Sequence, residues 1–511
     1  MQIKEQMGSD IFKYLKYSID EPMFFTSGIF WVFLALAILI YSAFYKKPVL
    51  RHAYLLVVSL YFYYQAGGWF FLMLIFSTLV DYFLGLKIHS AKTKKAGKLL
   101  LATSIVINLL VLMYFKYAYF ITDLFQGLTG VETQTVNVFS SLLNRTVGTN
   151  YDIHTIILPV GVSFYTFQTI SYTIDVYRKR VKPVRSIIDF GFYVSFFPQL
   201  VAGPIVRAAE FIPQLYQKYV LTASQFWHAV FLIMGGLIKK ILIADYLAIG
   251  LVDKVFESPL SFTGFENLVS MYSYAVQIYF DFSGYTDIAI GVALLFGFKL
   301  PINFNAPYQA SSLTDFWRRW HISLSSWLRD YLYIPLGGNR KGKIRTGLHV
   351  LLTMLLGGLW HGAQLKFALW GFYHGVILLL EKLFAGKSSE LSYKPGWKRL
   401  LSRVLTFHIV LLGWLIFRAD TPAIAWVMLK QVFVNFEFGT VLQFIRADAM
   451  VFILLVGSFI LIALPAGIKE LIRGWFILRP YWLKILIVLL ILFLLYEFQI
   501  SELKPFIYFQ F

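Results

Sequence analysis

Cysteine is absent from all 511 residues of the sequence, and charged side chains make up only 14% of them. Without cysteine the chain forms no disulfide, no thiolate metal site and no thiol nucleophile. Any covalent intermediate on the chain must therefore use a hydroxyl, an imidazole or an amine. The sequence also lacks helical repeats of about 20 to 50 residues and long polar segments. We therefore expect one domain over residues 1–511.

Hydrophobic residues make up 58% of the sequence, and soluble domains contain far more charge than this chain does. Long apolar stretches recur along the chain, each sufficient to cross much of a bilayer. We therefore expect an all-α integral membrane protein of about eleven spans, with re-entrant and amphipathic helices in addition. The stretches are Gly28–Tyr45, Trp69–Leu86, Leu99–Leu124, Ile153–Tyr177, Phe226–Val252, Leu268–Phe298, Leu348–Trp360, Phe367–Leu383, Val404–Phe417, Val451–Ile468 and Trp482–Phe498, with shorter candidates at Tyr54–Tyr64 and Phe190–Gly203.

The net charge of +19 is explained by membrane topology without a nucleic-acid partner, because the basic residues lie in short loops between apolar stretches. Lys and Arg are enriched in cytoplasmic loops and at the lipid headgroups. Basic clusters mark residues 46–51, 87–98, 178–185 and 299–345 as cytoplasmic, whereas the acidic segment 118–152 is expected outside. This pattern predicts that both termini lie outside.

Residues that are costly in lipid are concentrated between Gln277 and Gly375. Asp281 and Asp287 lie in an otherwise apolar stretch, and a carboxylate at that depth faces protein or a water-filled cavity. The two aspartates either mark a functional interior or form structural hydrogen bonds between helices.

The segment from Ser311 to Tyr331 predicts a single amphipathic helix rich in Arg and Trp, which Ser312 and Asp315 would cap. Its basic residues have two interpretations. They anchor an interfacial helix to lipid phosphate, or they bind the phosphates of a ligand. One predicted face carries Trp317, His321, Leu324, Leu328 and Tyr331, and the basic side chains are Arg318, Arg319 and Arg329.

Two further histidines, His361 and His374, lie in the apolar stretches that follow. A histidine in a membrane helix either bonds neighbouring helices or acts as a neutral base shielded from lipid. The glycines before His361 would let another backbone come close. No metal is expected, because His321, His361 and His374 are not spaced as ligands on one helix turn and residues 357–375 contain no carboxylate.

The motif pair Phe316-Trp-Arg-Arg-Trp-His321 and Trp360-His-Gly362 resembles that of the membrane-bound O-acyltransferase superfamily. Two more segments, Pro198–Pro204 and Phe280–Asp287, are similar to its bacterial branch, particularly the membrane component of alginate O-acetylation. The resemblance extends from about Met23 to Phe511. It implies a ring of helices around a thin central region with a tunnel, in the bacterial inner membrane.

The resemblance also implies catalytic roles for His361 and His321, and an extracytoplasmic acetyltransferase or polysaccharide-modifying partner. We expect an acyl group, acetyl by this resemblance, to enter as a cytoplasmic thioester and to leave as an ester on a polysaccharide outside. Acetyl-CoA and an acyl carrier protein remain alternative donors because both carry the same phosphopantetheine arm, and no permanently bound cofactor is expected. Arg318, Arg319 and Arg329 would bind the donor phosphates. His361 would act as general base, and His321 would orient the donor or stabilise the oxyanion.

Two other classes of function remain open at this stage. A transporter of an acyl donor or polysaccharide precursor would use Asp281 and Asp287 as coupling carboxylates, although no inverted repeat is evident. A non-catalytic scaffold for a soluble transferase would explain the large apolar body. The scaffold would leave the histidine at 361 and the Arg-rich segment unexplained.

The aromatic tail at residues 500–511 is expected outside and is either an interfacial belt or part of the site. Because the chain has no thiol, the phenol of Tyr508 is a chemically reasonable acyl relay. His361 would deprotonate Tyr508, which would carry the acyl group transiently to the outer partner.

Overall fold

The computed structural model describes residues 17–18, 22–148, 150, 152–340, 342–384, 396–498 and 506. The regular structure in these ranges is helical throughout, with no strand among them. The first part of the chain forms α2 (Gly28–Phe44), α3 (Pro48–Gly67), η1 (Gly68–Phe70), α4 (Phe71–His89), α5 (Lys94–Leu112), η2 (Met113–Tyr117), α6 (Ala118–Thr129), α7 (Val138–Val147), α8 (Val162–Tyr177), α9 (Ile187–Ser195), α10 (Phe197–Leu200) and α11 (Ala208–Leu215).

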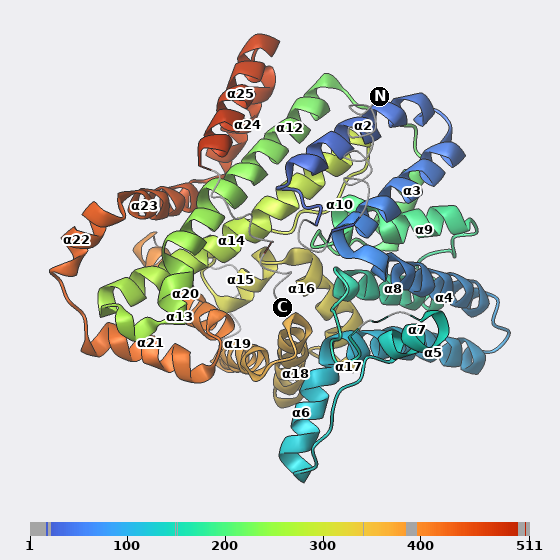
Figure 1. The fold of residues 1–511 in the computed structure, drawn as a ribbon, viewed down its shortest axis with the longest axis horizontal. Helices are drawn as coiled ribbons and strands as arrows, with labels where there is room; N and C mark the ends of the chain where they lie inside the picture. Colours follow the sequence, from blue (N-terminus) through green and yellow to red (C-terminus); the bar gives the residue numbers. More distant parts are fainter. Residues whose placement is uncertain are drawn as a thin grey trace.

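In Figure 1 the short helices α15 and α16 lie near the middle of the view, with longer helices on several sides of them. The second part of the chain forms α12 (Ala223–Leu237), η3 (Ile238–Asp245), η4 (Ala248–Val252), α13 (Asp253–Glu257), η5 (Pro259–Ser261), α14 (Gly264–Leu295), η6 (Pro307–Gln309), α15 (Leu313–Arg319), α16 (Ile322–Leu328), η7 (Arg329–Tyr333), α17 (Ile334–Leu336), α18 (Lys343–His361), α19 (Leu365–Phe384), α20 (Gly396–Arg418), α21 (Pro422–Val434), α22 (Thr440–Ala447), α23 (Ala449–Ala463), α24 (Ala466–Leu478) and α25 (Tyr481–Glu497).

The longest single helix, α14, joins the two hydrophobic cores of the molecule. A capping box between Thr263 and Glu266 starts this helix of 32 residues. Its first half packs in a core with α19, α20 and α21, and its second half packs in a core with α2, α3 and α8. A helix that is apolar on all sides is stable only when it is surrounded, and 89% of the most apolar window of α14 is buried.

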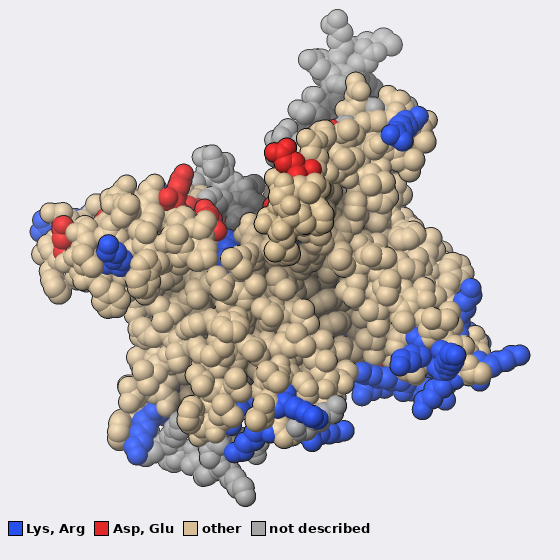
Figure 2. Space-filling model, turned by 90° about the horizontal axis from the view of Figure 1, so that it is seen from below, with Lys and Arg blue, Asp and Glu red and all other residues tan. Residues whose placement is uncertain are grey.

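Five helical segments in the described ranges are long and apolar enough to cross a membrane, or up to seven if each of two bent pairs is one span. The expected count of about eleven spans is not confirmed, because several predicted stretches form shorter or broken helices. The stretch Phe226–Val252, for example, becomes α12 followed by the π-helical segments η3 and η4. Figure 2 shows Lys and Arg gathered along one edge of the molecule, below a broad band with few charges. The chain is thus a multi-pass membrane protein.

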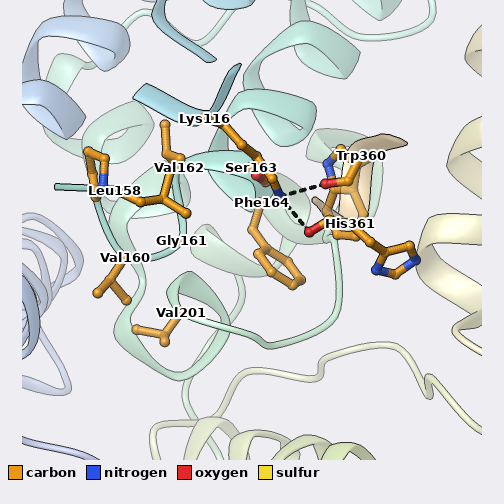
Figure 3. Close-up of a pocket in the computed structure, with 11 residues that line it drawn as sticks. Lys116, Leu158, Val160, Gly161, Val162, Ser163, Phe164, Val201, Trp360 and His361 are labelled. Atoms are coloured by element: carbon orange, nitrogen blue, oxygen red, sulfur yellow. Dashed lines mark hydrogen bonds between the residues drawn. The ribbon is translucent and has the colours of Figure 1, made fainter. Parts of the chain in front are cut away.

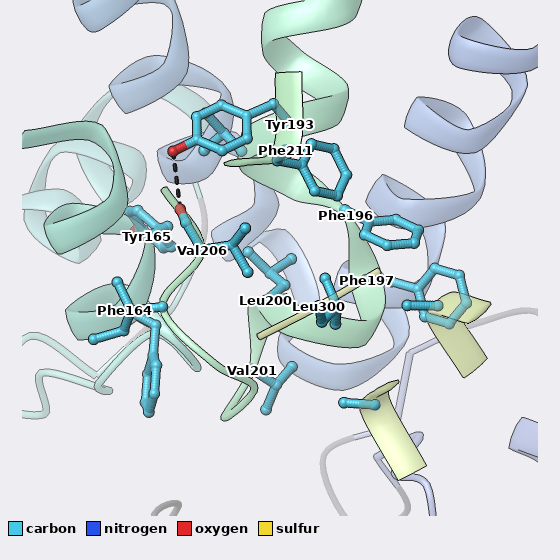
Figure 4. Packing of buried hydrophobic residues seen from close by; sticks show 14 of the residues in the cluster. Phe164, Tyr165, Tyr193, Phe196, Phe197, Leu200, Val201, Val206, Phe211 and Leu300 are labelled. Atoms are coloured by element: carbon cyan, nitrogen blue, oxygen red, sulfur yellow. Dashed lines mark hydrogen bonds between the residues drawn. The ribbon is translucent and has the colours of Figure 1, made fainter. Parts of the chain in front are cut away.

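The predicted short stretch Phe190–Gly203 lies in the core that contains α2, α3, α8 and the second half of α14. Within this stretch α9 and α10 meet at a bend. Figure 4 shows its aromatic and aliphatic side chains packed together, and the Tyr193 hydroxyl donates a hydrogen bond to the carbonyl of Val206 at 3.0 Å. A Cβ at Gly203 would lie 2.4 Å from the Cα of Gln199. The turn within Pro198–Pro204 therefore requires glycine at that position.

Candidate active site

The predicted single helix over Ser311–Tyr331 is wrong, because the chain breaks at His321. Ser312 caps α15 as expected, its hydroxyl accepting from the backbone N–H of Asp315 at 3.0 Å. The helix then ends, Trp320 is extended, and His321 has a φ of 44°, in the left-handed region. Backbone hydrogen bonds to the preceding loop form on both sides of this break. The Asn305 N–H donates to the carbonyl of Arg319, and the Ile322 N–H donates to the carbonyl of Asn303, each at 2.9 Å. The expected common face of this segment therefore does not form.

The side chain of His321 is fully buried, and its ring orientation is fixed by Asn303. The Oδ1 atom of Asn303 accepts from both the backbone N–H and the hydroxyl of Ser323, at 3.1 and 2.9 Å. The same oxygen lies 3.2 Å from Nδ1 of His321, so Nδ1 carries the proton and Nε2 is left as an acceptor. Burial lowers the pKa of His321 to about 3, which keeps this ring neutral at physiological pH.

His361 ends α18, and the ring of Trp360 contacts both His361 and His321. The ring centroid of Trp360 lies 5.0 Å from that of His361 and 6.1 Å from that of His321. The His361 ring also packs edge-on against Trp370 and Phe417, at 5.2 and 5.3 Å, and the residue is buried. The fold thus brings both motif histidines into contact with one indole ring.

Glycines at the α18–α19 contact confirm the close backbone approach that the sequence predicted beside His361. A Cβ at Gly358 would lie 2.3 Å from the carbonyl oxygen of Phe367, and a Cβ at Gly371 would lie 2.4 Å from that of Met354. The two helices therefore touch backbone to backbone just before His361, which limits how far the end of α18 can move.

The sequence interpretation missed two residues that hold the end of α18. The ammonium of Lys116 donates to the carbonyl oxygens of Trp360 and His361, at 2.6 and 2.9 Å, as Figure 3 shows. The neighbouring Tyr117 hydroxyl donates to the carbonyl of Leu359 at 2.6 Å. A lysine within the apolar stretch Leu99–Leu124 is itself a signal, because an ionisable side chain at that depth is costly without a partner.

The ring of Trp370 contacts both His361 and His374. The ring of His374 is 4.9 Å from Trp370 and 5.3 Å from Trp317. The side chain is fully buried, with no hydrogen-bond partner for either ring nitrogen among the described residues. His361, Trp370, His374 and Trp317 form a cluster of rings that connects the end of α18 to α15.

Two of the three arginines proposed as phosphate ligands form ion pairs with neighbouring aspartates. Arg319 donates to Asp315 at 2.8 Å, and Arg329 donates to Asp330 at 2.7 Å. Arg318 is exposed and forms no ion pair within the described ranges. Arg318 and Arg329 are thus both exposed, and Arg318 is the one of the three without a carboxylate partner in the described ranges.

Asp281 and Asp287 each face a lysine of the adjacent segment η3. Lys240 lies 2.6 Å from Asp281 and 2.7 Å from Asp245, and Lys239 pairs with Asp287. Both aspartates therefore link α14 to η3 through ion pairs. Among the described residues no group of three or more His, Asp or Glu side chains is placed to hold a metal ion.

Tyr508 and most of the predicted tail, residues 500–511, lie outside the described residues, apart from Phe506. Phe506 is 1% exposed and packs edge-on against Tyr285 of α14, with ring centroids 4.5 Å apart. The ammonium of Lys240 lies 4.7 Å from the centroid of the same ring. This one residue of the tail is thus held in the molecular interior.

Comparison with known proteins matches residues 56–417 to the membrane-bound O-acyltransferase family. The chain is 40% identical to a probable alginate O-acetylase of Pseudomonas aeruginosa over 82% of its own length and 76% of that protein. It is 34% identical to a peptidoglycan O-acetyltransferase of Helicobacter pylori, over 76% of its own length and 75% of that protein. A teichoic acid D-alanyltransferase of Bacillus subtilis is 29% identical over 52% of the chain and 69% of that protein. The chain therefore belongs to the membrane-bound O-acyltransferase family and is a membrane-bound acyltransferase.

Proposed function

We propose that the chain passes an acetyl group from a cytoplasmic thioester to the outer face of the bacterial inner membrane, for O-acetylation of an extracytoplasmic polysaccharide. The observation that carries this proposal is that the buried rings of His321 and His361 both contact the ring of Trp360. The names of the alginate and peptidoglycan relatives support an acetyl group and a polysaccharide acceptor. In this proposal the helices form a ring of about eleven spans around a tunnel, with both termini outside.

His361 acts as the general base in this reaction. It is neutral when it takes a proton, and its ring lies in an aromatic, water-poor setting against Trp370 and Phe417. Such a base removes the proton from a hydroxyl as the hydroxyl attacks the thioester carbonyl. The C–S bond then breaks, and the thiol of the donor leaves with a proton.

His321 orients the donor in this scheme, and its tautomer favours that role over oxyanion stabilisation. Its Nδ1–H is directed at Asn303, so Nε2 offers a lone pair and no proton. A lone pair accepts a hydrogen bond from an amide N–H, which the phosphopantetheine arm contains, but it repels an oxyanion. His321 would therefore hold the arm while His361 acts on the hydroxyl.

The donor is acetyl-CoA or an acetylated acyl carrier protein, and exposed Arg318 is the first contact for its phosphate. Arg319 and Arg329 would add positive charge while remaining paired with Asp315 and Asp330. Arginine suits this task because its planar group binds phosphate through two parallel hydrogen bonds.

The hydroxyl that first receives the acetyl group is that of Tyr508, which then presents an aryl ester to an extracytoplasmic acetyltransferase. Burial of Phe506 supports this relay. Phe282 and Tyr285 lie three residues apart on α14 and so are neighbours on its surface. Phe282 contacts His321 at 4.7 Å between ring centroids, and Tyr285 contacts Phe506. Tyr508 is two residues beyond Phe506, within about 7 Å of extended chain.

Purified chain incubated with carbon-14 acetyl-CoA, or with acetyl-loaded acyl carrier protein, tests the proposal. We expect one acetyl group per chain on Tyr508 by intact mass and peptide mapping, and no adduct in His361→Gln or Tyr508→Phe. Gln retains hydrogen bonding but cannot take a proton, so it separates a base from a structural residue. Normal labelling of His361→Gln by both donors would overturn the assignment of the base.

A further inference from the structure

Lys116 is held inside the molecule by the last residues of a helix that is distant in sequence. It belongs to the π-helical turn η2, between α5 and α6, and lies 244 residues before Trp360. Its ammonium binds the carbonyl oxygens of Trp360 and His361, and it lies 5.8 Å from the centroid of the Trp360 ring. Single π-helical turns occur in helices frequently at functional sites.

The carbonyl groups at the end of α18 need hydrogen-bond donors from outside the helix. The last carbonyl groups of an α-helix have no acceptor role within the helix, and together they carry a partial negative charge. At this end Lys116 and Tyr117 donate hydrogen bonds to three successive carbonyl oxygens, those of Leu359, Trp360 and His361. Four residues later α19 begins, so the connection after His361 is short.

The imidazole of His361 points away from Lys116, as Figure 3 shows. On the Lys116 side lies a cavity of about 70 Å³, lined chiefly by residues 158–164. Lys116 therefore contacts the backbone of His361, and the reacting ring lies on the other side, against Trp370 and Phe417.

We propose that Lys116 is a positioning residue for acyl transfer, which fixes the backbone at the end of α18 and thereby aims the ring of His361. The inference rests on the proposed role of His361 as the base. A base that is misaligned by a fraction of an ångström loses rate in the chemical step, whereas donor binding at a separate surface is unaffected. Lys116 therefore acts on kcat more than on KM.

The cavity beside Lys116 makes a conservative replacement informative. The cavity of about 70 Å³ is several times larger than the roughly 10–15 Å³ that one buried water needs, so it has room for the larger guanidinium group. Lys116→Arg can then donate to both carbonyls, whereas Lys116→Met keeps the length of the side chain and loses the donors and the charge. Lys484→Met is a matched control, because Lys484 is also buried against an aromatic ring, that of Trp227 at 4.7 Å, in α25.

The test measures steady-state acetyl transfer from acetyl-CoA and from acetyl-loaded acyl carrier protein, using the full chain in detergent. We expect Lys116→Met to lower kcat at least tenfold with KM for the active donor changed less than threefold. Lys116→Arg should recover most of the rate, and Lys484→Met should behave as the wild type. Size-exclusion profiles and melting curves verify that each variant is folded.

A second measurement needs no turnover. Diethylpyrocarbonate modifies histidine rings, and peptide mass spectrometry gives the modification rate of His361 alone. We expect Lys116→Met to change this rate at least threefold, and Lys116→Arg and Lys484→Met to leave it near the wild-type value. Unchanged kcat and unchanged modification in Lys116→Met would overturn the inference. If His361→Gln remains active while Lys116→Met still alters the modification rate, the proposed base is wrong and the positioning contact stands.

Discussion

Lys240 and Asp281 form a buried ion pair of 2.6 Å whose side chains are 1% and 4% exposed. The pair links η3 to the middle of α14, and Asp245 adds a second carboxylate to the same ammonium at 2.7 Å. Removing one of the two carboxylates leaves the buried ammonium only partly compensated. Measuring the stability and the uptake activity of Asp281 variants can therefore distinguish a structural role from a role in transport.

We expect Asp281→Asn to lower the free energy of unfolding by about 1–3 kcal/mol, because the buried Lys240 ammonium loses one of its two carboxylates and keeps Asp245. The double variant Lys240→Met with Asp281→Asn should recover part of that loss. Melting curves in detergent report both effects. A variant Asp281→Asn that folds normally but loses ion-coupled uptake in proteoliposomes would instead support the transporter interpretation.

A second prediction concerns Asn303, which fixes the tautomer of His321. We expect Asn303→Ala to lower kcat for acetyl transfer on the order of tenfold or more, because the ring of His321 is then free to change its protonated nitrogen. Asn303→Asp keeps an acceptor at Oδ1 and should retain more activity than the alanine variant. Equal activity of the alanine variant and the wild type would remove the tautomer of His321 from the mechanism.

Glycine packing between α18 and α19 gives a third prediction. A methyl group at Gly358 would meet the Phe367 carbonyl at 2.3 Å, so Gly358→Ala must separate the helices and displace His361. We expect a loss of about 1–3 kcal/mol in stability together with lost acetyl transfer. Gly235→Ala in α12 is the control, because nothing lies within 4 Å of its added Cβ. A fully active Gly358→Ala variant would contradict the close contact.

Features that depend on local pattern could be predicted from the sequence. Composition alone identified a multi-pass membrane protein, and the motif pair identified the family before any geometry was known. The Ser312 cap and the close approach of backbone near His361 also follow from residue type and spacing, and the structure confirms both. These are properties of neighbouring residues or of single helices.

Features that depend on distant contacts could not be predicted in this way. The helical periodicity of Ser311–Tyr331 gives no sign of the break at His321, which the loop residues Asn303 and Asn305 hold through backbone hydrogen bonds. A single sequence likewise gives no sign that Lys116 reaches His361 or that Lys240 reaches Asp281. Tertiary contacts override local preference at these positions, and they lie around the candidate site.

The last prediction concerns Phe506, the tail residue that is buried against α14. Its ring fills the space between Tyr285 and the ammonium of Lys240, so Phe506→Ala removes both an aromatic contact and a cation–π contact. If Tyr508 is the relay, loss of this anchor lets the tail leave the interior, and its phenol no longer meets His361. We expect Phe506→Ala to reduce acetylation of Tyr508 at least tenfold, whereas Phe506→Tyr should retain most of it.

Phe493→Ala is the matched control for Phe506→Ala, because Phe493 lies on α25 before the tail and is 58% exposed. Both alanine variants remove one aromatic ring near the end of the chain, but Phe506 is buried against Tyr285 of α14 whereas Phe493 is exposed. Intact-mass analysis after incubation with donor and without acceptor measures the adduct in each variant, and melting curves verify folding. Wild-type labelling of Tyr508 in Phe506→Ala would show that the anchor is dispensable for the relay. Wild-type polysaccharide acetylation in Tyr508→Phe, by contrast, would exclude the relay itself and leave Phe506 as a packing contact of the helical body.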